Sequence, residues 1–527
     1  MKREIDKLKN SEFDVLIIGG GIHGAAIAYE TSRLGFKTAL IEKFDFGSQT
    51  SANSLKVLHG GLRYLQHANF KRMRESIYSR KSFQKIAPHL VRSVPFVIPT
   101  FGYAVKSKLA LKIAMILNDL ISFDRNKNIE EECFVPGGKT ISKDKLFKII
   151  PGFANKKVTG GAVWYESIAI NTERLLFEFL HKAYEKGSVL TNYVNAVKYN
   201  FNNSNIDSVS VKDMITNDEF SVKAKIIINS VGPWLNEILL GTSDLSFLNS
   251  PLTKAVNVII KKNLFTEYAV GLESEKEFTD KAAIINKGKR LFFFIPLGNY
   301  TMIGTTYKIF NDNPDNCKIS DNDISEIINE INSSYKSLNL TKNDIVQTHV
   351  GVQAMPNVKF ENEFDVQPET HSRIFDHKSE GNIDNLISIK SVKYTTAPSI
   401  AKNIIGILKN RIPNKHATFI VENIVHISKD DFFGKNKSYD TETLQRLWTT
   451  YGTKSQKVIE FIEKNEDSKS MIFSNEKVYK GEIYYCLNEE LALTSKDILD
   501  RRIGLSALEK LPDEYYSKVD QIINKKK

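Results

Sequence analysis

The first fifty residues hold the feature that most constrains the fold, a strand–turn–helix–strand pattern with a glycine-rich turn. Residues 13–18 are a nearly continuous apolar run, typical of a parallel strand buried on both faces. Gly19, Gly21 and Gly24 follow with GxGxxG spacing and lead into an apolar helix. In this pattern the glycines allow a tight turn, close approach of a pyrophosphate and close helix–strand packing. The amino terminus is therefore predicted to bind a dinucleotide.

The residues after the turn favour FAD over NAD. A second predicted strand ends in Glu42, 18 residues after Gly24, where a carboxylate commonly bonds ribose hydroxyls. Residues 43–65 are then rich in Ser, Thr, Asn and Gly, among them Thr50 and Ser51. Small hydroxyl and amide groups suit a segment that wraps an extended cofactor. A simple NAD-binding domain would instead continue into another crossover helix.

The composition limits the class of protein. A length of 527 residues predicts two or three domains, and the net charge of +11 permits anionic partners without selecting one. Three widely spaced cysteines exclude a disulfide framework or zinc site, and no metal-binding, GxSxG or Walker motif occurs. The cysteine usage favours a reducing cytoplasm, and no signal-peptide pattern precedes the first strand. Residues 109–123 predict an amphipathic helix, for which packing on the protein is favoured over a membrane surface.

A series of segments in the same order resembles the FAD-dependent glycerol-3-phosphate dehydrogenases and their oxidase relatives, within the glutathione-reductase-like flavoproteins. The segments are IIGGGIHGAAIA, TSANSLKVLHGGLRYL, APHLV, GAVWYESIAINTERLL, INSVGPW, FFFIPLGNYTMIGTT, KYTTAPSIA, YGTKSQKVIEFI and GEIYYCLNEELALTSKDILDRRIGL. The resemblance runs nearly end to end. It implies FAD as cofactor and oxidation of glycerol 3-phosphate to dihydroxyacetone phosphate by hydride transfer to flavin N5. It also implies reoxidation by membrane quinone, with oxygen as the alternative.

The resemblance places the HGGLRYL segment beside the flavin ring. Gly60 and Gly61 would let the ring rest against the main chain, and Arg63 and Tyr64 would face the substrate. The guanidinium of Arg63 is a rigid donor fork suited to phosphate. His59 is the candidate base, although a lone histidine is more often structural.

Two further turns are predicted near the cofactor. Residues 225–232 form a strand that ends at Gly232, where an ordinary strand-to-helix turn is the alternative. Residues 386–389 predict a strand and residues 395–408 a helix, which Thr395 or Thr396 can cap. The amino terminus of this helix would favour negative charge on the flavin. Lys393 would strengthen that effect or hold substrate phosphate, a surface lysine being the alternative. The predicted cofactor contacts are Gly19, Gly21, Gly24, Glu42, Thr50, Ser51, Gly60, Gly61, Gly232, Thr395 and Thr396.

The sequence departs from the family pattern in the expected substrate pocket. Gln353 stands where the family has an arginine, so about 1.5–3 kcal/mol of phosphate binding is missing unless His349 or a lysine compensates. Tyr307 replaces an aspartate, and residues 391–392 replace a glycine pair. These changes leave two alternatives open: a flavoenzyme for another small hydroxy or amino compound, and a flavin-binding sensor without turnover.

The predicted architecture is α/β, with a Rossmann-like FAD-binding domain, an antiparallel-sheet substrate domain and a helical carboxy-terminal domain. The FAD-binding domain is discontinuous and takes residues 10–95, 155–250 and 345–425; the substrate domain takes 96–154 and 251–344, and the helical domain 430–527. Expected partners are a small phosphorylated polyol and quinone or oxygen, without nucleic acid. A homodimer and a peripheral contact with an anionic membrane on the inner face of the cell are left open.

Overall fold

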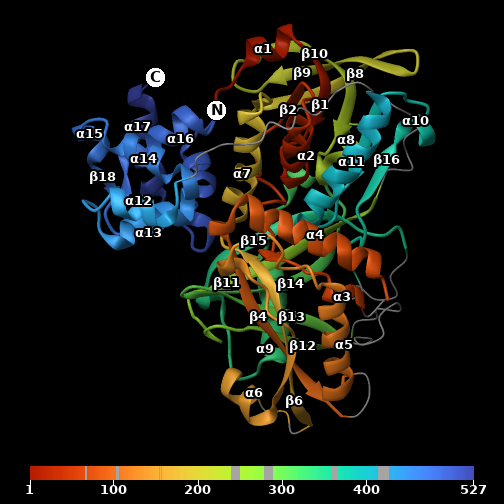
Figure 1. Cartoon of the computed structure of the whole chain (residues 1–527), viewed down its shortest axis with the longest axis vertical. Helices are drawn as coiled ribbons and strands as arrows, with labels where there is room; N and C mark the ends of the chain where they lie inside the picture. Colours follow the sequence, from red (N-terminus) through yellow and green to blue (C-terminus); the bar gives the residue numbers. More distant parts are fainter. Residues whose placement is uncertain are drawn as a thin grey trace.

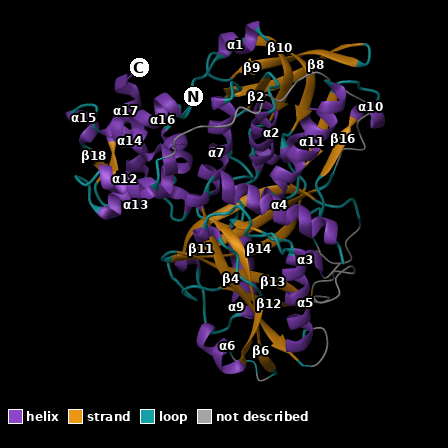
Figure 2. Cartoon of the chain, viewed as in Figure 1, coloured by secondary structure: helices purple, strands orange, loops and turns teal. Residues whose placement is uncertain are grey.

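Two β-sheets and a separate helical unit make up the chain in this computed structural model (Figure 1, Figure 2). The α/β class with a helical carboxy-terminal domain, expected from the sequence, is confirmed. The structure describes residues 1–65, 68–102, 106–153, 155, 157–238, 250–277, 289–358, 366, 368–412 and 427–526.

The first sheet has a parallel centre. Its order is β16 (Arg373–Asp376), β17 (Leu386–Lys390), β10 (Glu219–Asn229), β1 (Glu12–Ile18), β2 (Thr38–Ile41) and β7 (Val189–Thr191), in which only β16 is antiparallel to its neighbour. Six of the seven residues of β1 are buried, as the apolar run predicts for a central parallel strand.

Helices cover one face of this sheet and a small antiparallel sheet extends over the other. The helices are α2 (Ile22–Arg33), α7 (Thr172–Glu185) and α11 (Ala397–Arg411), whose apolar faces join one core with β1 and β17. On the opposite face β8 (Val194–Asn202) and β9 (Asn205–Asp213) continue antiparallel from β10, and the short α1 (Ile5–Asn10) packs nearby. These layers bury the parallel strands on both sides.

The second sheet is antiparallel except where β12 meets β4. Its order is β15 (Ile345–Ala354), β11 (Leu252–Ile260), β14 (Tyr300–Phe310), β13 (Lys289–Leu297), β12 (Ala269–Glu277), β4 (Val91–Phe101), β6 (Val158–Ala169) and β3 (Val57–Leu58), with β5 (Lys139–Ser142) paired to β6. Three of these strands, β3, β6 and β15, come from stretches assigned above to the FAD-binding domain. The sheet therefore joins segments of both proposed domains.

Helices also cover the second sheet. α9 (Asp321–Ser334) and α6 (Lys143–Ile149) pack on one face, and α5 (Lys108–Ile121) packs on the other through Leu111 and Met115. α4 (Phe70–Ile86) lies between the two sheets and follows the short α3 (Leu62–Leu65), as Figure 1 shows.

The carboxy-terminal domain has its own apolar core. It consists of α12 (Lys429–Lys435), α13 (Thr441–Tyr451), α14 (Ser455–Ile462), α15 (Glu466–Lys469), α16 (Lys480–Glu489), α17 (Asp513–Lys526), the hairpin β18 (Met471–Phe473) with β19 (Val478–Tyr479), and a π-helical turn, η10 (Asp497–Arg502). Figure 1 places it beside α7. Ion pairs join the two, including the buried pair of Arg174 with Glu490 at 2.8 Å and the partly buried pair of Lys454 with Glu178 at 2.9 Å.

Burial makes several histidines sensitive to acid. It lowers the pKa to about 4 at His23, His89, His181, His349 and His377. An exposed histidine in the unfolded chain titrates near ~6.5, so between these values the unfolded chain binds more protons than the folded one. Stability from these groups is therefore complete above pH 6.5 and is lost as the pH falls toward 4.

We expect the free energy of unfolding to fall between pH 7 and pH 5 by about 2 kcal/mol for each such histidine. Thermal unfolding at the two pH values measures this. The His377→Gln variant, whose amide can still bond the Ser388 hydroxyl that lies 2.9 Å from His377 Nε2, should lose less than the wild type. Equal losses in both proteins would contradict the role given to His377.

Candidate functional site

The glycine-rich turn between β1 and α2 is shaped by close packing. Gly19 has a φ of +101°, and a Cβ there would lie 2.8 Å from the Ser230 carbonyl oxygen. A Cβ at Gly24 would overlap the Gly19 carbonyl oxygen. Ser51 Oγ accepts the Ile22 amide at 3.0 Å, at the first turn of α2. The amino terminus of α2 therefore opens on the space where an anion would be stabilised.

Glu42, at the end of β2, is held by backbone amides. The Gly20 amide donates to Oε2 at 2.7 Å and the Phe44 amide to Oε1 at 2.8 Å. Burial raises the pKa of this carboxyl, and the two amides oppose the rise. Each oxygen keeps a second lone pair that could accept a ribose hydroxyl.

A first cavity of about 390 Å³ runs along this turn. Its lining includes the predicted residues Gly19, Gly21, Glu42, Thr50, Ser51, Gly232, Gln353 and Lys393. His23 Nε2 and Ser48 Oγ also belong to lining residues, are buried, and have no hydrogen-bond partner among the described residues. Buried polar atoms are rarely left unpaired, so both atoms point to a polar ligand in this cavity.

A second, larger cavity of about 1090 Å³ lies against the antiparallel sheet. Predicted residues in its lining are His59, Gly61, Tyr64, Thr395, Thr396 and Tyr307. Six residues line both cavities: Asn53, Ser54, Gln353, Val392, Lys393 and Tyr394. The two cavities therefore meet beside Lys393.

Lys393 and Tyr64 contact each other at this junction. Lys393 Nζ donates to Tyr64 Oη at 2.9 Å, which brings together two residues 329 positions apart. The Lys393 ammonium also lies 4.8 Å from the centroid of the Tyr64 ring. The structure thus places a cation and a phenol hydroxyl at the mouth between the cavities.

The threonines after Lys393 do not cap α11 as predicted. Thr395 Oγ1 donates to the Val57 carbonyl and accepts the His59 amide, both at 3.3 Å. Thr396 Oγ1 donates to the Lys393 carbonyl at 2.8 Å, and no side chain caps the helix. The Thr395 hydroxyl thus joins this turn to the His59 segment, whereas the Thr396 hydroxyl closes the turn on itself.

Close packing against α4 requires glycine at both Gly60 and Gly61. A Cβ at Gly60 would overlap the Arg80 guanidinium, and one at Gly61, whose φ is +91°, would lie 2.9 Å from Met73 Cα. The Gly60 amide donates to the buried carboxylate of Glu166. Burial raises the pKa of Glu166 to about 6, although the Arg80 guanidinium opposes the rise.

Sequence reasoning missed Glu166 and Arg72. Glu166 lies on β6 and lines the second cavity, and its signal was that it is the one charged residue of this strand. Arg72 also lines this cavity, with its guanidinium 5.8 Å from the Tyr64 ring centroid and Nη1 at 2.7 Å from His371 Nδ1. Arg72 belongs to no sequence motif, so the sequence did not indicate that it lines this cavity.

Three predicted residues line neither cavity, and one side chain is not described. Gly24 and Gly60 are packed behind their turns. His349 Nε2 donates to the Ala507 carbonyl at 3.0 Å, so its ring contacts the carboxy-terminal domain. On β15 the residues that line the first cavity begin at Gly351. His349 precedes them and therefore lies outside the cavity. The side chain of Arg63 lies outside the described residues.

The sequence and fold are similar to known flavoproteins. The family described as FAD dependent oxidoreductase matches residues 14–402, and the one described as C-terminal domain of alpha-glycerophosphate oxidase matches residues 413–527. Glycerol-3-phosphate dehydrogenase of Synechocystis sp. is 27% identical over 96% of this chain and 91% of its own length. Alpha-glycerophosphate oxidase of Streptococcus pneumoniae is 30% identical over 67% of this chain and 56% of its own. The crystal structure of the Bacillus halodurans glycerol-3-phosphate dehydrogenase complexed with FAD has a TM-score of 0.74, at 19% identity over 99% of this chain and 93% of that one.

The residues of the first cavity fit FAD. Glu42 has free lone pairs for ribose hydroxyls, and the first turn of α2 with Ser51 suits a pyrophosphate. The unpartnered Ser48 and His23 atoms offer further donors. The opposite end of the cavity opens at Lys393, where the ring of the cofactor would meet the second cavity.

Substituting Gly24 with alanine should disrupt this site. The added methyl group would overlap the Gly19 carbonyl, so we expect a loss of about 1–3 kcal/mol in stability and FAD binding weakened by about tenfold or more. Fluorescence titration with FAD and thermal unfolding measure the two effects.

The matched control is Gly406→Ala, an exposed helix position in α11 where a Cβ meets nothing within 4 Å. This variant should gain up to about 1 kcal/mol in stability and keep its FAD affinity. Equal FAD affinity in the two variants would contradict the packing role of Gly24.

Proposed function

Because the chain belongs to the FAD-dependent oxidoreductase family, we propose that it oxidises glycerol 3-phosphate to dihydroxyacetone phosphate. The observation that carries the proposal is the Lys393–Tyr64 pair at the junction of the cofactor cavity with the second cavity. The names of the relatives support the same substrate, and the matched carboxy-terminal family supports it independently of the cofactor fold.

Residues around the junction would orient the substrate and take its proton. Bound FAD supplies, at N5, the acceptor for the hydride that leaves the substrate carbon. Lys393 and Tyr64 would hold the developing alkoxide or the phosphate, since both present hydrogen-bond donors at the cavity mouth. We assign His59, which lines the second cavity, as the base that accepts the hydroxyl proton.

Binding of a phosphorylated substrate requires a positively charged side chain in the pocket, and the side chain of Gln353 is neutral. Gln353 lines both cavities, so the neutral amide lies where the family arginine would act. Arg72 lines the second cavity near Tyr64 and is the described residue that best compensates. Arginine suits phosphate because its planar fork bonds two oxygens together.

The neutral Gln353 also favours a second candidate. Together with Tyr307 and the side chains of residues 391–392, it makes this end of the pocket less suited to a dianion. A small uncharged hydroxy compound or an amine is therefore the alternative substrate on the same scaffold.

We propose membrane quinone as electron acceptor and an anionic membrane surface as the docking partner, through α5. One face of this helix exposes Leu109, Ile113, Ile116, Leu117 and Leu120, and Phe123 follows with 81% of its surface exposed. Lys108 and Lys112 are also exposed and would meet anionic headgroups.

The other face of α5 lines the second cavity, and this supports an apolar electron acceptor such as quinone. Leu111, Ala114 and Met115 line the second cavity, so this one helix lies between the exposed apolar surface and the proposed reaction site. The helix thus packs on the protein, as the sequence predicted, and also leaves an apolar face uncovered.

No helix among the described residues is long and apolar enough to span a bilayer. Oxygen is the alternative acceptor, in line with the oxidase name of the Streptococcus pneumoniae relative.

Anaerobic mixing of the FAD-loaded protein with glycerol 3-phosphate tests the substrate. Flavin absorbance should bleach within the turnover time, and Gln353→Arg should lower the substrate Kd because it restores a charge-assisted contact. Bleaching by unphosphorylated glycerol or an amine alone would favour the second candidate. No bleaching by any of them would contradict an enzymatic role.

Arg72→Gln should weaken binding of glycerol 3-phosphate by about tenfold, and an unchanged Kd would remove Arg72 from the site.

Sedimentation with vesicles tests the membrane surface. The wild type should bind vesicles that contain phosphatidylglycerol, less tightly at high salt. Replacing both Ile113 and Leu120 with serine should abolish binding, whereas Ile215→Ser, which removes an equally exposed side chain elsewhere, should not. Equal binding by all three proteins would contradict the role of α5.

A further inference from the structure

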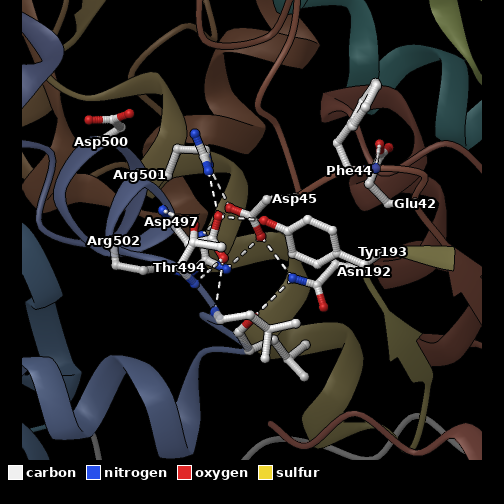
Figure 3. A network of polar contacts seen from close by, with 12 residues as sticks. Glu42, Phe44, Asp45, Asn192, Tyr193, Thr494, Asp497, Asp500, Arg501 and Arg502 are labelled. Atoms are coloured by element: carbon white, nitrogen blue, oxygen red, sulfur yellow. Dashed lines mark hydrogen bonds and ion pairs between the residues drawn. The ribbon is translucent and has the colours of Figure 1, made fainter. Parts of the chain in front are cut away.

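Asp45 connects the cofactor cavity to the carboxy-terminal domain. It is buried, with 1% of its surface exposed, and its carboxylate accepts four hydrogen bonds (Figure 3). Oδ2 accepts Arg501 Nε at 2.5 Å and Arg502 Nη1 at 2.6 Å. Oδ1 accepts Arg502 Nη2 at 2.8 Å and Asn192 Nδ2 at 2.9 Å. Two guanidiniums from the far end of the chain therefore hold one carboxylate of the amino-terminal domain.

The two arginines are fixed within the carboxy-terminal domain. Arg501 Nη2 donates to Asp497 Oδ1 at 2.7 Å, and Arg502 Nε donates to the Glu490 carbonyl at 2.8 Å. Figure 3 shows Asp497 between Arg501 and Tyr193, whose hydroxyl donates to Asp497 Oδ1 at 2.7 Å. Residues of both domains thus contribute to one buried polar network, in which little movement is possible without breaking charge-assisted bonds.

The segment that contains Asp45 is a wall of the first cavity. We call residues 42–48 the cofactor strap; its members Glu42, Asp45 and Ser48 line that cavity. The Gly47 amide donates to the Gly20 carbonyl at 3.1 Å, and the Ser48 amide donates to the Asp45 carbonyl at 3.2 Å. A shift of Asp45 would therefore move the strap against the glycine-rich turn.

The positive charges of Arg501 and Arg502 stabilise the ionised form of Asp45. Burial alone would raise the pKa of Asp45, but Arg502 and Arg501 outweigh it and hold the pKa well below its ordinary value. The carboxylate is therefore ionised at neutral pH, and removing either partner while the domains stay docked would leave a buried charge without its counterion. No described residue of the carboxy-terminal domain lines the first cavity, so any influence on the cofactor passes through contacts such as this one.

We propose that the carboxy-terminal domain is a working part of the FAD site, because Arg501 and Arg502 position the cofactor strap through Asp45. Asp45 is thus a positioning residue, and its role concerns cofactor retention whatever the substrate is. Since linkage is reciprocal, docking of the domain favours FAD binding, and bound FAD favours docking of the domain.

Titration of the apoprotein variants with FAD tests the proposal. Asp45→Asn and Arg501→Gln should each raise the FAD Kd by about five- to fiftyfold, mainly through faster dissociation. The matched control is Glu178→Gln, which breaks the 2.9 Å ion pair with Lys454 between the same domains but lies outside the strap. It should lower the unfolding temperature and leave the FAD Kd within about twofold. Asp45→Asn and Arg501→Gln proteins that lose stability but keep wild-type FAD affinity would overturn the proposal.

Amide hydrogen exchange on the wild type gives a second readout that does not depend on the variants folding. Addition of FAD should slow exchange in residues 497–502, although these residues do not line the cavity. Exchange in residues 429–435 of α12, in the same domain and packed on α13, serves as the internal reference. Slowing confined to residues that line the cavity would contradict the coupling.

Discussion

The close contact between β1 and α2 at the glycine-rich turn is the constraint on which the rest of the site depends. Gly24 packs against the Gly19 carbonyl, and the Ser230 hydroxyl at the end of β10 donates to the carbonyls of Ile18 and Gly19 at 2.9 Å. This contact aligns the carboxyl ends of the parallel strands, where α/β folds bind ligands. Glu42 after β2, Gly232 after β10 and Lys393 after β17 all reach the same edge for this reason.

Local features of the site could be predicted from the sequence because they depend on neighbouring residues. The burial of β1, the GxGxxG turn and Glu42 follow from short-range patterns, and the strand at residues 386–389 with the helix from about 395 is similarly local. Lys393 and Tyr64 were nominated separately from a resemblance. Only the fold brings them into contact across 329 positions.

Features that depend on long-range pairing could not be predicted. The residues of β3, β6 and β15 were assigned to the FAD-binding domain, and the pairing of these strands in the antiparallel sheet depends on contacts distant in sequence. His349 shows the same difficulty, because β15 extends past the cavity to the carboxy-terminal domain and its ring meets Ala507 there. Asp45 and Glu166 carry no motif. Their importance lies in partners such as Arg501 and Arg80, which sequence spacing does not reveal.

Charge is distributed unevenly between the two cavities. Around the first, Glu42 and the strap present acceptors to a nucleotide, while the junction presents the Lys393 ammonium and the Tyr64 hydroxyl. Cations at the junction would stabilise both a reduced flavin ring and an anionic substrate, which explains how one site can serve cofactor and substrate together. In the proposed reaction the neutral Gln353 would add no charge at its position, so discrimination among substrates would depend on the remaining cations.

A crystal structure of the protein grown with FAD tests the central claim most directly. Electron density should place the adenosine at Glu42, the pyrophosphate at the first turn of α2 and the flavin ring between the HGG segment and Lys393. Density for the cofactor along any other path, or a ring distant from Lys393 and Tyr64, would contradict the account.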